Sequence, residues 1–229
     1  MTILYEDNHI IAVNKTCSEI VQGDKTGDKP LSEMVKEYIK VKYNKPGDVF
    51  IGVPHRLDRP TSGVVLFART SKALSRLTMM FANHGEIRKT YWAIVPNKNN
   101  QEQSKVADIV TLDNYLWRNE KQNKSYVVTA EHKDAKRAIL HYRVIATAER
   151  YQLLEIQLET GRHHQIRCQL ANIGLPIKGD LKYGAERSNP DGGICLHARS
   201  IDFIHPVSKQ PIHIVAPTPD QAIWKIFEI

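Results

Sequence analysis

Residues 49–68 read VFIGV PHRLDRPTSG VVLFA, which is a polar stretch at 54–63 between two β-prone runs. Charged groups cost several kcal/mol each to desolvate, so a fold keeps them between strands only if they pair or have a function. Asp58 is therefore the first candidate for a catalytic carboxylate. As a structural alternative, Asp58 caps a turn.

The segments around this stretch alternate between short β-prone runs and amphipathic helices. The first run turns at Glu-Asp-Asn-His, which predicts an opening hairpin. Periodic apolar residues predict the two helices. The elements expected in this half are strands at 3–5, 10–13, 49–53, 64–68 and 91–95, and helices at 30–43 and 71–81, the second with Ser71 near its N-cap.

The second half begins with a polar, Asn-, Gln- and Lys-rich segment at 97–137, which we expect to be a long connection carrying short strands. Two β-prone runs then flank Thr-Ala-Glu-Arg and predict a hairpin. The further elements expected are strands at 138–146, 151–158, 196–203 and 211–216, a helix at 163–171 capped by Gly174, and a closing helix at 219–227. The pattern by itself supports mixed α and β structure in one domain over 1–229.

A second charged cluster, TGRHHQIR at 160–167, lies where a strand ends and a helix is expected to begin. The first turn of a helix offers free backbone N–H groups to an anion, and Arg162 and Arg167 add positive charge. If Arg167 meets Asp58, the pair keeps the carboxylate ionised. Taken singly, Arg167 is equally typical of an exposed helix face.

The formal net charge is +7, which suits a polyanionic partner such as nucleic acid. Between Trp117 and Arg143, seven Lys or Arg face three Asp or Glu; this basic segment either follows a phosphate backbone or is a solvated loop. The longest apolar run is far too short for a membrane span. Three widely separated cysteines and an acidic N-terminus without a signal pattern favour the cytoplasm.

The stretch HRLDRPTSG at 55–63 resembles the signature of RluA-type RNA pseudouridine synthases, in which the Asp is catalytic. KTYWAIV at 89–95 resembles the second motif of that family, and GRHHQIR at 161–167 the third. PIKGD at 176–180 with Tyr183-Gly184, and Leu196-His197-Ala198, follow in the expected order. The chain departs from the family at Lys15-Thr16-Cys17-Ser18, where Lys-Pro-x-Gly is usual, and at His163, where Thr or Ser is usual.

The resemblance implies an α+β fold with a central, mostly antiparallel mixed β-sheet flanked by helices and loops. It also implies an enzyme that flips a uridine out of rRNA or tRNA and rejoins its base through carbon. Asp58 would act at the ribose, Arg167 would pair with Asp58, and Tyr91 would stack on the uracil. Arg56 would fill the vacated stack, and Leu196 would line an apolar pocket. The other RNA contacts expected are His55, Arg59, Lys89, Arg162 and His164.

Three chemical routes stay open: addition of the carboxylate to the sugar, addition to the base, or removal of a sugar proton. None requires a metal or other cofactor, and adjacent histidines such as His163 and His164 are poor paired metal ligands. We expect a monomer that needs no protein partner and selects a short RNA stem-loop. The alternative functions are a non-catalytic RNA-binding protein on the same scaffold and a metal-dependent phosphoesterase using His55 and Asp58.

Overall fold

The computed structural model describes residues 1–24, 27–83, 85–97 and 108–227. The chain divides into two compact units, Met1–Arg88 with Ala198–Pro217, and Lys89–His197 with Thr218–Ile229. Here they are called unit 1 and unit 2. Mostly antiparallel strands flanked by helices make up the two units, so the predicted α+β class is confirmed. The single catalytic domain expected over 1–229 stays a prediction.

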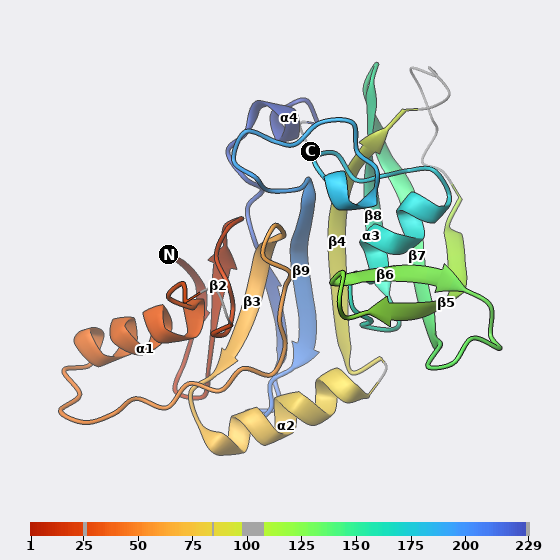
Figure 1. The fold of residues 1–229 in the computed structure, drawn as a ribbon. Coiled ribbons are helices and arrows are strands. Elements are labelled where there is room, and N and C mark those ends of the chain that lie inside the picture. Colours follow the sequence, from red (N-terminus) through yellow and green to blue (C-terminus); the bar gives the residue numbers. More distant parts are fainter. Residues whose placement is uncertain (25–26, 84, 98–107, 228–229) are drawn as a thin grey trace. The chain divides into compact units, whose positions relative to one another are not determined.

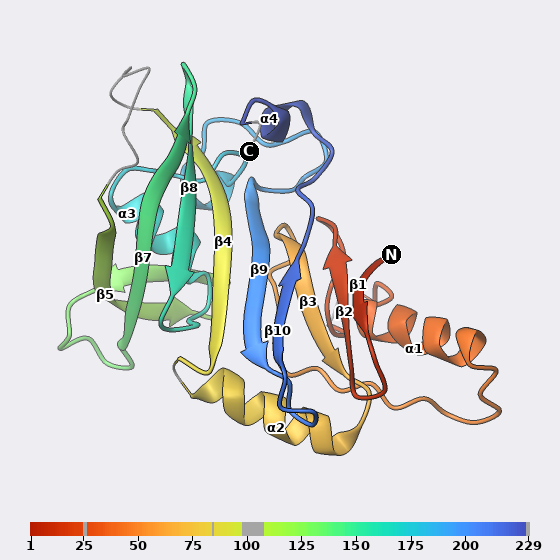
Figure 2. The same cartoon turned by 180° about the vertical axis from the view of Figure 1, so that it is seen from behind.

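Unit 1 is a sheet with a helix packed against each face. Its strands are ordered β1-β2-β3-β9, and β10 pairs with β9 (Figures 1 and 2). In this unit, β2 pairs antiparallel with β1 and with β3, and β10 pairs antiparallel with β9. The elements are β1 (Thr2–Glu6), β2 (Ile10–Lys15), α1 (Leu31–Lys42), β3 (Ser62–Ala68), α2 (Ser71–Ala82), β9 (Leu196–Ile204, in this unit from Ala198) and β10 (Pro211–Val215).

Successive residues of β2 and β3 contribute to two different cores, because side chains alternate between the faces of a strand. Val64 and Leu66 join α2 residues such as Leu77 in one core. Val65 and Phe67 join α1 residues in the other. The continuous apolar run of β3 therefore reflects a strand covered on both faces, which makes it a rigid base for the polar loop that precedes it.

Unit 2 is an antiparallel sheet ordered β4-β8-β7-β5-β6 (Figure 2). Helix α3 lies against it, and the buried side chains Leu116, Ala138, Cys168 and Tyr183 form the core between them. The elements are β4 (Ile87–Pro96, in this unit from Lys89), β5 (Val110–Asn119), β6 (Lys124–Val128), β7 (Lys136–Thr147), β8 (Tyr151–Leu158), α3 (Gln165–Asn172), the 3-10 turn η1 (Leu181–Tyr183) and α4 (Ala222–Lys225).

Most sequence-predicted elements are confirmed, and the differences have local causes. Residues 49–53 form no strand; Gly52 alone makes a β-bridge, to Ala68 at the end of β3. The N-cap of α2 is Thr70, whose hydroxyl accepts the Ala73 N–H, and not Ser71. The closing helix is one turn at Ala222–Lys225. Within 97–137 the short strands β5 and β6 are present, and residues 98–107 lie outside the described residues.

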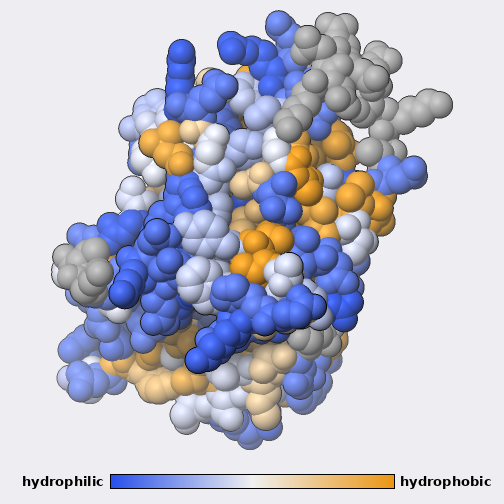
Figure 3. Space-filling model, turned by 45° about the vertical axis from the view of Figure 1, so that its right-hand side comes forward, coloured by the Kyte–Doolittle hydropathy of each residue, from blue (hydrophilic) through white to orange (hydrophobic). Residues whose placement is uncertain are grey.

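The described helices are all too short or too polar to cross a membrane. Hydrophilic residues cover most of the face drawn in Figure 3, with hydrophobic residues in separate small patches.

Candidate active site

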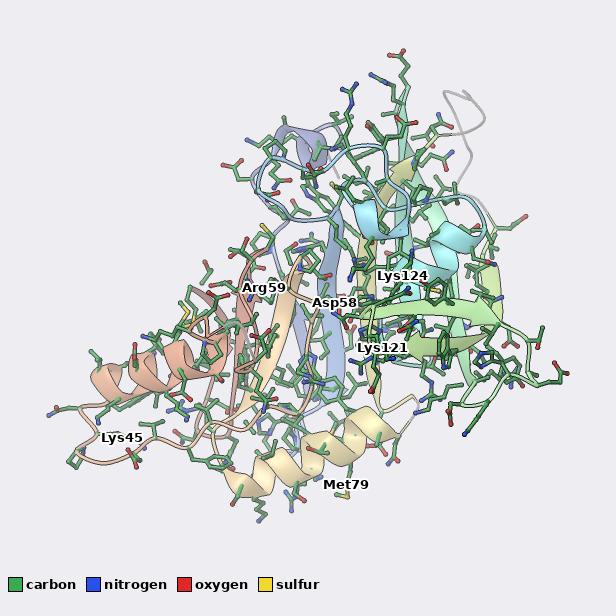
Figure 4. The ribbon with its side chains drawn as sticks, in the orientation of Figure 1. Lys45, Asp58, Arg59, Met79, Lys121 and Lys124 are labelled. Carbon is green, nitrogen blue, oxygen red and sulfur yellow. The ribbon has the colours of Figure 1, made fainter. Side chains whose placement is uncertain are left out.

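Asp58 lies on the loop that leads into β3, next to Arg59 (Figure 4). The Thr61 N–H donates to the Asp58 carbonyl at 3.0 Å, which closes a turn, and the Ser18 N–H donates to the Arg59 carbonyl at 3.1 Å. The Asp58 side chain is partly exposed, whereas Arg56 and Arg59 are exposed. The loop thus presents a carboxylate flanked by two cations.

Lys15, the last residue of β2, anchors this loop through hydrogen bonds to its carbonyls. Its side chain is completely buried, and its ammonium donates to the carbonyls of Thr16 (3.0 Å), Arg59 (2.9 Å) and Thr61 (2.6 Å). Burial lowers the pKa of Lys15 to about 8, although the nearby negative charges of Glu19 and Asp58 oppose this change. The sequence reasoning did not give Lys15 a role; the signal was a Lys ending an otherwise apolar strand.

Gly63 fixes the point where the loop enters β3. Its φ is +115°, a conformation that residues with a side chain rarely adopt. A Cβ at this position would lie 2.3 Å from the carbonyl oxygen and 2.5 Å from the nitrogen of Ala198 in β9. Only glycine lets β3 approach β9 this closely, so the final residue of the HRLDRPTSG stretch is explained by backbone packing.

His55 and Arg59, both expected to contact RNA, also have structural contacts in unit 1. His55 Nε2 accepts the Leu66 N–H at 2.9 Å, and its ring stacks on Phe81 with centroids 4.3 Å apart. Arg59 forms an ion pair with Asp28. His55 therefore anchors the start of the loop to β3, and its RNA contact stays a prediction.

In unit 2, Arg167 on α3 is buried against Asp180. The guanidinium donates from Nε to Oδ2 at 2.6 Å and from Nη2 to Oδ1 at 2.9 Å, a bidentate geometry. Side-chain exposure is 6% for Arg167 and 1% for Asp180. The guanidinium carbon also lies 5.1 Å from the centre of the Tyr183 ring. Asp180 and Tyr183 thus fix the orientation of Arg167, a role that the sequence motif PIKGD did not by itself reveal.

His164 caps α3 in the left-handed conformation, with φ +51°. Its Nδ1 lies 3.0 Å from the Tyr183 hydroxyl, which also accepts the Ser125 N–H at 2.8 Å. Burial, together with the positive charge of Arg167, lowers the pKa of His164 to about 2, so the ring is neutral. The helix starts at Gln165 and not at His163. The expected contact of His164 with RNA stays a prediction for a ring that is buried.

The remaining expected residues of unit 2 lie on β4, β9 and the loop before α3. Tyr91 is buried opposite Ile156 of β8, and Leu196 is buried at the start of β9. Burial lowers the pKa of Lys89, whose ammonium lies against Gly161. Arg162 is exposed and donates from Nε to the Arg137 carbonyl at 3.0 Å.

The structure therefore gathers the sequence-predicted residues into two groups. Unit 1 carries His55, Arg56, Asp58 and Arg59 on one loop, and unit 2 carries the others. The pairing of Arg167 with Asp58 would join the two units and stays a prediction. Among the described residues, no three His, Cys, Asp or Glu side chains are grouped to hold a metal ion.

Residues 9–172 match the family model of RNA pseudouridylate synthases. The chain belongs to this family. The RluA-type resemblance is confirmed, and with it the enzyme class: the protein is a pseudouridine synthase, an isomerase.

Relatives of this pseudouridine synthase match it along nearly its whole length. The tRNA pseudouridine synthase C of Vibrio cholerae is 33% identical over 98% of this chain and 93% of its own. The RNA pseudouridine synthase YlyB of Bacillus subtilis is 32% identical over 96% and 70%, respectively. The ribosomal large subunit pseudouridine synthase D of Xylella fastidiosa is 30% identical over 96% of this chain and 66% of its own.

Among solved structures, human RNA pseudouridylate synthase domain containing 4 superposes with a TM-score of 0.76. It is 21% identical and covers 96% of this chain and 89% of its own. At this identity the likeness establishes the fold, and the pseudouridine synthase catalytic fold is confirmed.

Proposed function

We propose that this synthase isomerises one or more uridines in a structured tRNA or rRNA, with Asp58 as the essential carboxylate. The relatives named for tRNA and for large-subunit rRNA support both substrate classes. The formal charge of +7 favours binding to either polyanion.

The target uridine must leave its stack before reaction, which costs a few kcal/mol in lost stacking. Arg56, exposed on the Asp58 loop, would occupy the vacated space. Tyr91 would stack on the flipped uracil, a contact worth about 1–3 kcal/mol per base. Leu196 would keep water from the separated base, since water at C1′ would release free uracil.

Asp58 would then act at the ribose while the bond between C1′ and N1 breaks. The uracil turns, a bond forms between C1′ and C5, and the proton on C5 is lost as N1 gains one. The exchange is balanced without a redox step. Arg167 would keep Asp58 ionised by its fixed positive charge.

One observation carries this proposal: the carboxylate at the family's catalytic position lies on a loop that His55 anchors before it and that Lys15 and Gly63 anchor after it. Lys15 binds the carbonyls of Arg59 and Thr61, and Gly63 packs the loop end against Ala198. A catalytic group needs such support, because a misplacement of about 1 Å can cost 100-fold in rate. A pure binding surface would not require it.

Asp58→Asn tests the assignment, with Asp48→Asn as the matched control because Asp48 is exposed on the loop after α1. The assay measures pseudouridine formation in unmodified tRNA and rRNA transcripts. We expect Asp58→Asn to lose at least about 100-fold in rate, as for a lost catalytic acid or base, with RNA affinity within about twofold. An active Asp58→Asn enzyme would refute the role of Asp58.

The substrate is identified by mapping pseudouridines in total RNA from cells with and without the gene. We expect one or a few sites to disappear and to return on complementation with the wild type, but not with Asp58→Asn. A wild-type protein that binds RNA and changes no uridine would support the non-catalytic alternative. Light scattering of the purified, active protein tests the expected monomer.

A further inference from the structure

Unit 2 contains a cavity that the proposed chemistry does not use. It is lined by residues of the turn between β7 and β8 and of the segment between α3 and β9, and its volume is about 660 Å³. Ligand sites typically measure about 300–1,000 Å³, so a nucleotide would fit. Its lining residues are Pro96, Arg150, Tyr151, Gly174, Pro176, Lys178, Gly179, Gly184, Ala185, Glu186, Arg187 and Ser188.

Positive charge dominates the lining. Arg150, Lys178 and Arg187 face a single acidic residue, Glu186. In the described part of the chain, none of the three cations belongs to an ion pair. The ammonium of Lys178 donates to Asn189 Oδ1 at 2.7 Å, which fixes its position and leaves two further N–H donors. The cavity therefore attracts an anion and can bond it.

One wall is aromatic. Tyr151, the first residue of β8, is half-buried, and the Lys178 ammonium lies 6.0 Å from the centre of its ring. On the opposite segment, Gly184 has φ +99°, and a Cβ there would contact nothing within 4 Å. The wall at Gly184 is thus open, and Tyr151 lines the same cavity, where its ring offers a surface for a planar group.

We propose that this cavity binds a nucleotide of the substrate RNA other than the target uridine. Arg150, Lys178 and Arg187 would contact its phosphates, and its base would stack on Tyr151. Both arginines are exposed, which suits a continuous RNA strand better than an enclosed free nucleotide. The inference rests on the proposed function for the identity of the ligand.

The cavity is also joined to the Arg167 cluster through the chain. Lys178 and Asp180 are separated by Gly179 alone, and the Gly179 φ of +90° turns the chain between them. Lys178 lines the cavity while Asp180 binds Arg167. RNA held in the cavity would therefore stabilise the segment that orients Arg167.

The test compares Arg150→Ala/Arg187→Ala with Lys40→Ala/Lys45→Ala, which removes two exposed charges from α1 and the loop after it, where Figure 4 labels Lys45. The probes are fluorescein-labelled transcripts, one pool of tRNAs and one of large-subunit rRNA fragments. We expect the arginine variant to bind at least one pool about tenfold more weakly, with a log–log salt slope smaller by about 1.4. Equal affinities of the two double variants would overturn the proposal.

Tyr151→Leu and Tyr151→Phe separate stacking from folding. We expect Tyr151→Leu to weaken binding about tenfold and Tyr151→Phe to stay within about twofold, since the ring is retained. Equal binding by both variants would exclude stacking and overturn the proposal. Millimolar uridine monophosphate is not expected to displace RNA; displacement that requires Arg150 and Arg187 would assign the cavity to a free nucleotide instead.

Pseudouridine formation at saturating RNA distinguishes this inference from the proposed function. We expect the arginine variant to lose less rate there than at limiting RNA, because the loss is mainly one of affinity. If the wild type forms no product while the affinity difference persists, the proposed function fails and the RNA site stands. If the wild type is active and the arginine variant binds like the lysine control, the site alone fails.

Discussion

The two buried cations near the candidate catalytic residues are neutralised in different ways. In unit 1, the Lys15 ammonium is surrounded by three backbone carbonyls. In unit 2, the Arg167 guanidinium is paired with the Asp180 carboxylate in a bidentate geometry. Carbonyl dipoles compensate only part of the lost hydration, and burial lowers the pKa of Lys15 to about 8.

The difference indicates which of the two charges depends on pH. A guanidinium stays protonated at every physiological pH, so the Arg167 pair is permanent once folded. An ammonium with a pKa near 8 can lose its proton, and the Asp58 loop would then lose a donor for its carbonyls. The contact of Lys15 with the Asp58 loop should therefore depend on pH, whereas the orientation of Arg167 should depend on Asp180.

The largest expected effect on stability comes from Asp180→Asn, which removes the anion and leaves Arg167 buried. Breaking a buried pair from one side typically costs about 3–5 kcal/mol. Urea denaturation measures this cost. Asp220→Asn is the control, since Asp220 is 87% exposed in its pair with Lys225 and surface pairs contribute about 0–1 kcal/mol. Similar stabilities of the two variants would contradict the importance of the Arg167 pair.

Lys15→Met should have the next largest effect, because it removes the donor to the carbonyls of Arg59 and Thr61. Leaving buried acceptors without a donor costs about 1–3 kcal/mol. We also expect slower pseudouridine formation with nearly unchanged RNA affinity, since the Asp58 loop would be less well placed. Lys36→Met, at a partly exposed position on α1 that forms a surface ion pair with Glu33, should change stability by less than about 0.5 kcal/mol. Full activity of Lys15→Met would show that the loop needs no such support.

The pH dependence of Lys15 sharpens the comparison. Its pKa falls from 10.5 in the unfolded chain to about 8 in the folded protein. Between these values the unfolded state binds more protons, so stability rises with pH in this window. From pH 8 to 10.5, the free energy of unfolding of the wild type should rise relative to that of Lys15→Met by at most about 1.4 kcal/mol per pH unit. If denaturation curves showed a constant difference in unfolding free energy between the two proteins over these pH values, Lys15 would not titrate there.

The sequence predicted most of the fold, because burial on both sheet faces leaves long apolar runs such as that of β3. It failed at 49–53, where a β-prone run forms only the Gly52 bridge. Composition could not distinguish a strand from an apolar loop that packs into the core beside α1, since both bury the same residue types. The short closing helix failed for a similar reason: its periodicity is real, but one turn suffices to bury Trp224.

For the site, the motifs identified the residues expected to perform the chemistry but not those that support them. Lys15, Asp180 and Tyr183 act through contacts between segments distant in sequence, such as Lys15 with Thr61. Such contacts leave no local periodicity. His164 shows the opposite case: a polar residue in a motif suggested RNA contact, while the structure buries it against Tyr183.

The smallest expected effect concerns His164, the neutral neighbour of the Arg167 pair. Its pKa falls from 6.5 in the unfolded chain to about 2 in the folded protein, so folding stability is lost as pH drops below 6.5. At one pH unit below 6.5 the loss relative to His164→Asn should be about 1 kcal/mol. Asn tolerates the left-handed backbone and can still bond the Tyr183 hydroxyl, so the variant should fold.

Denaturation at pH 7.5 and 5.5, about one unit to either side of 6.5, measures this difference, with His132→Asn as the exposed control. The control should lose as much stability in acid as the wild type, because it leaves His164 and its surroundings unchanged. If His164→Asn and the wild type lost equal stability, His164 would have to accept a proton inside the cluster. The positive charge of Arg167 opposes protonation of the neighbouring His164 ring. The loss of stability in acid therefore tests whether Arg167 stays charged beside His164.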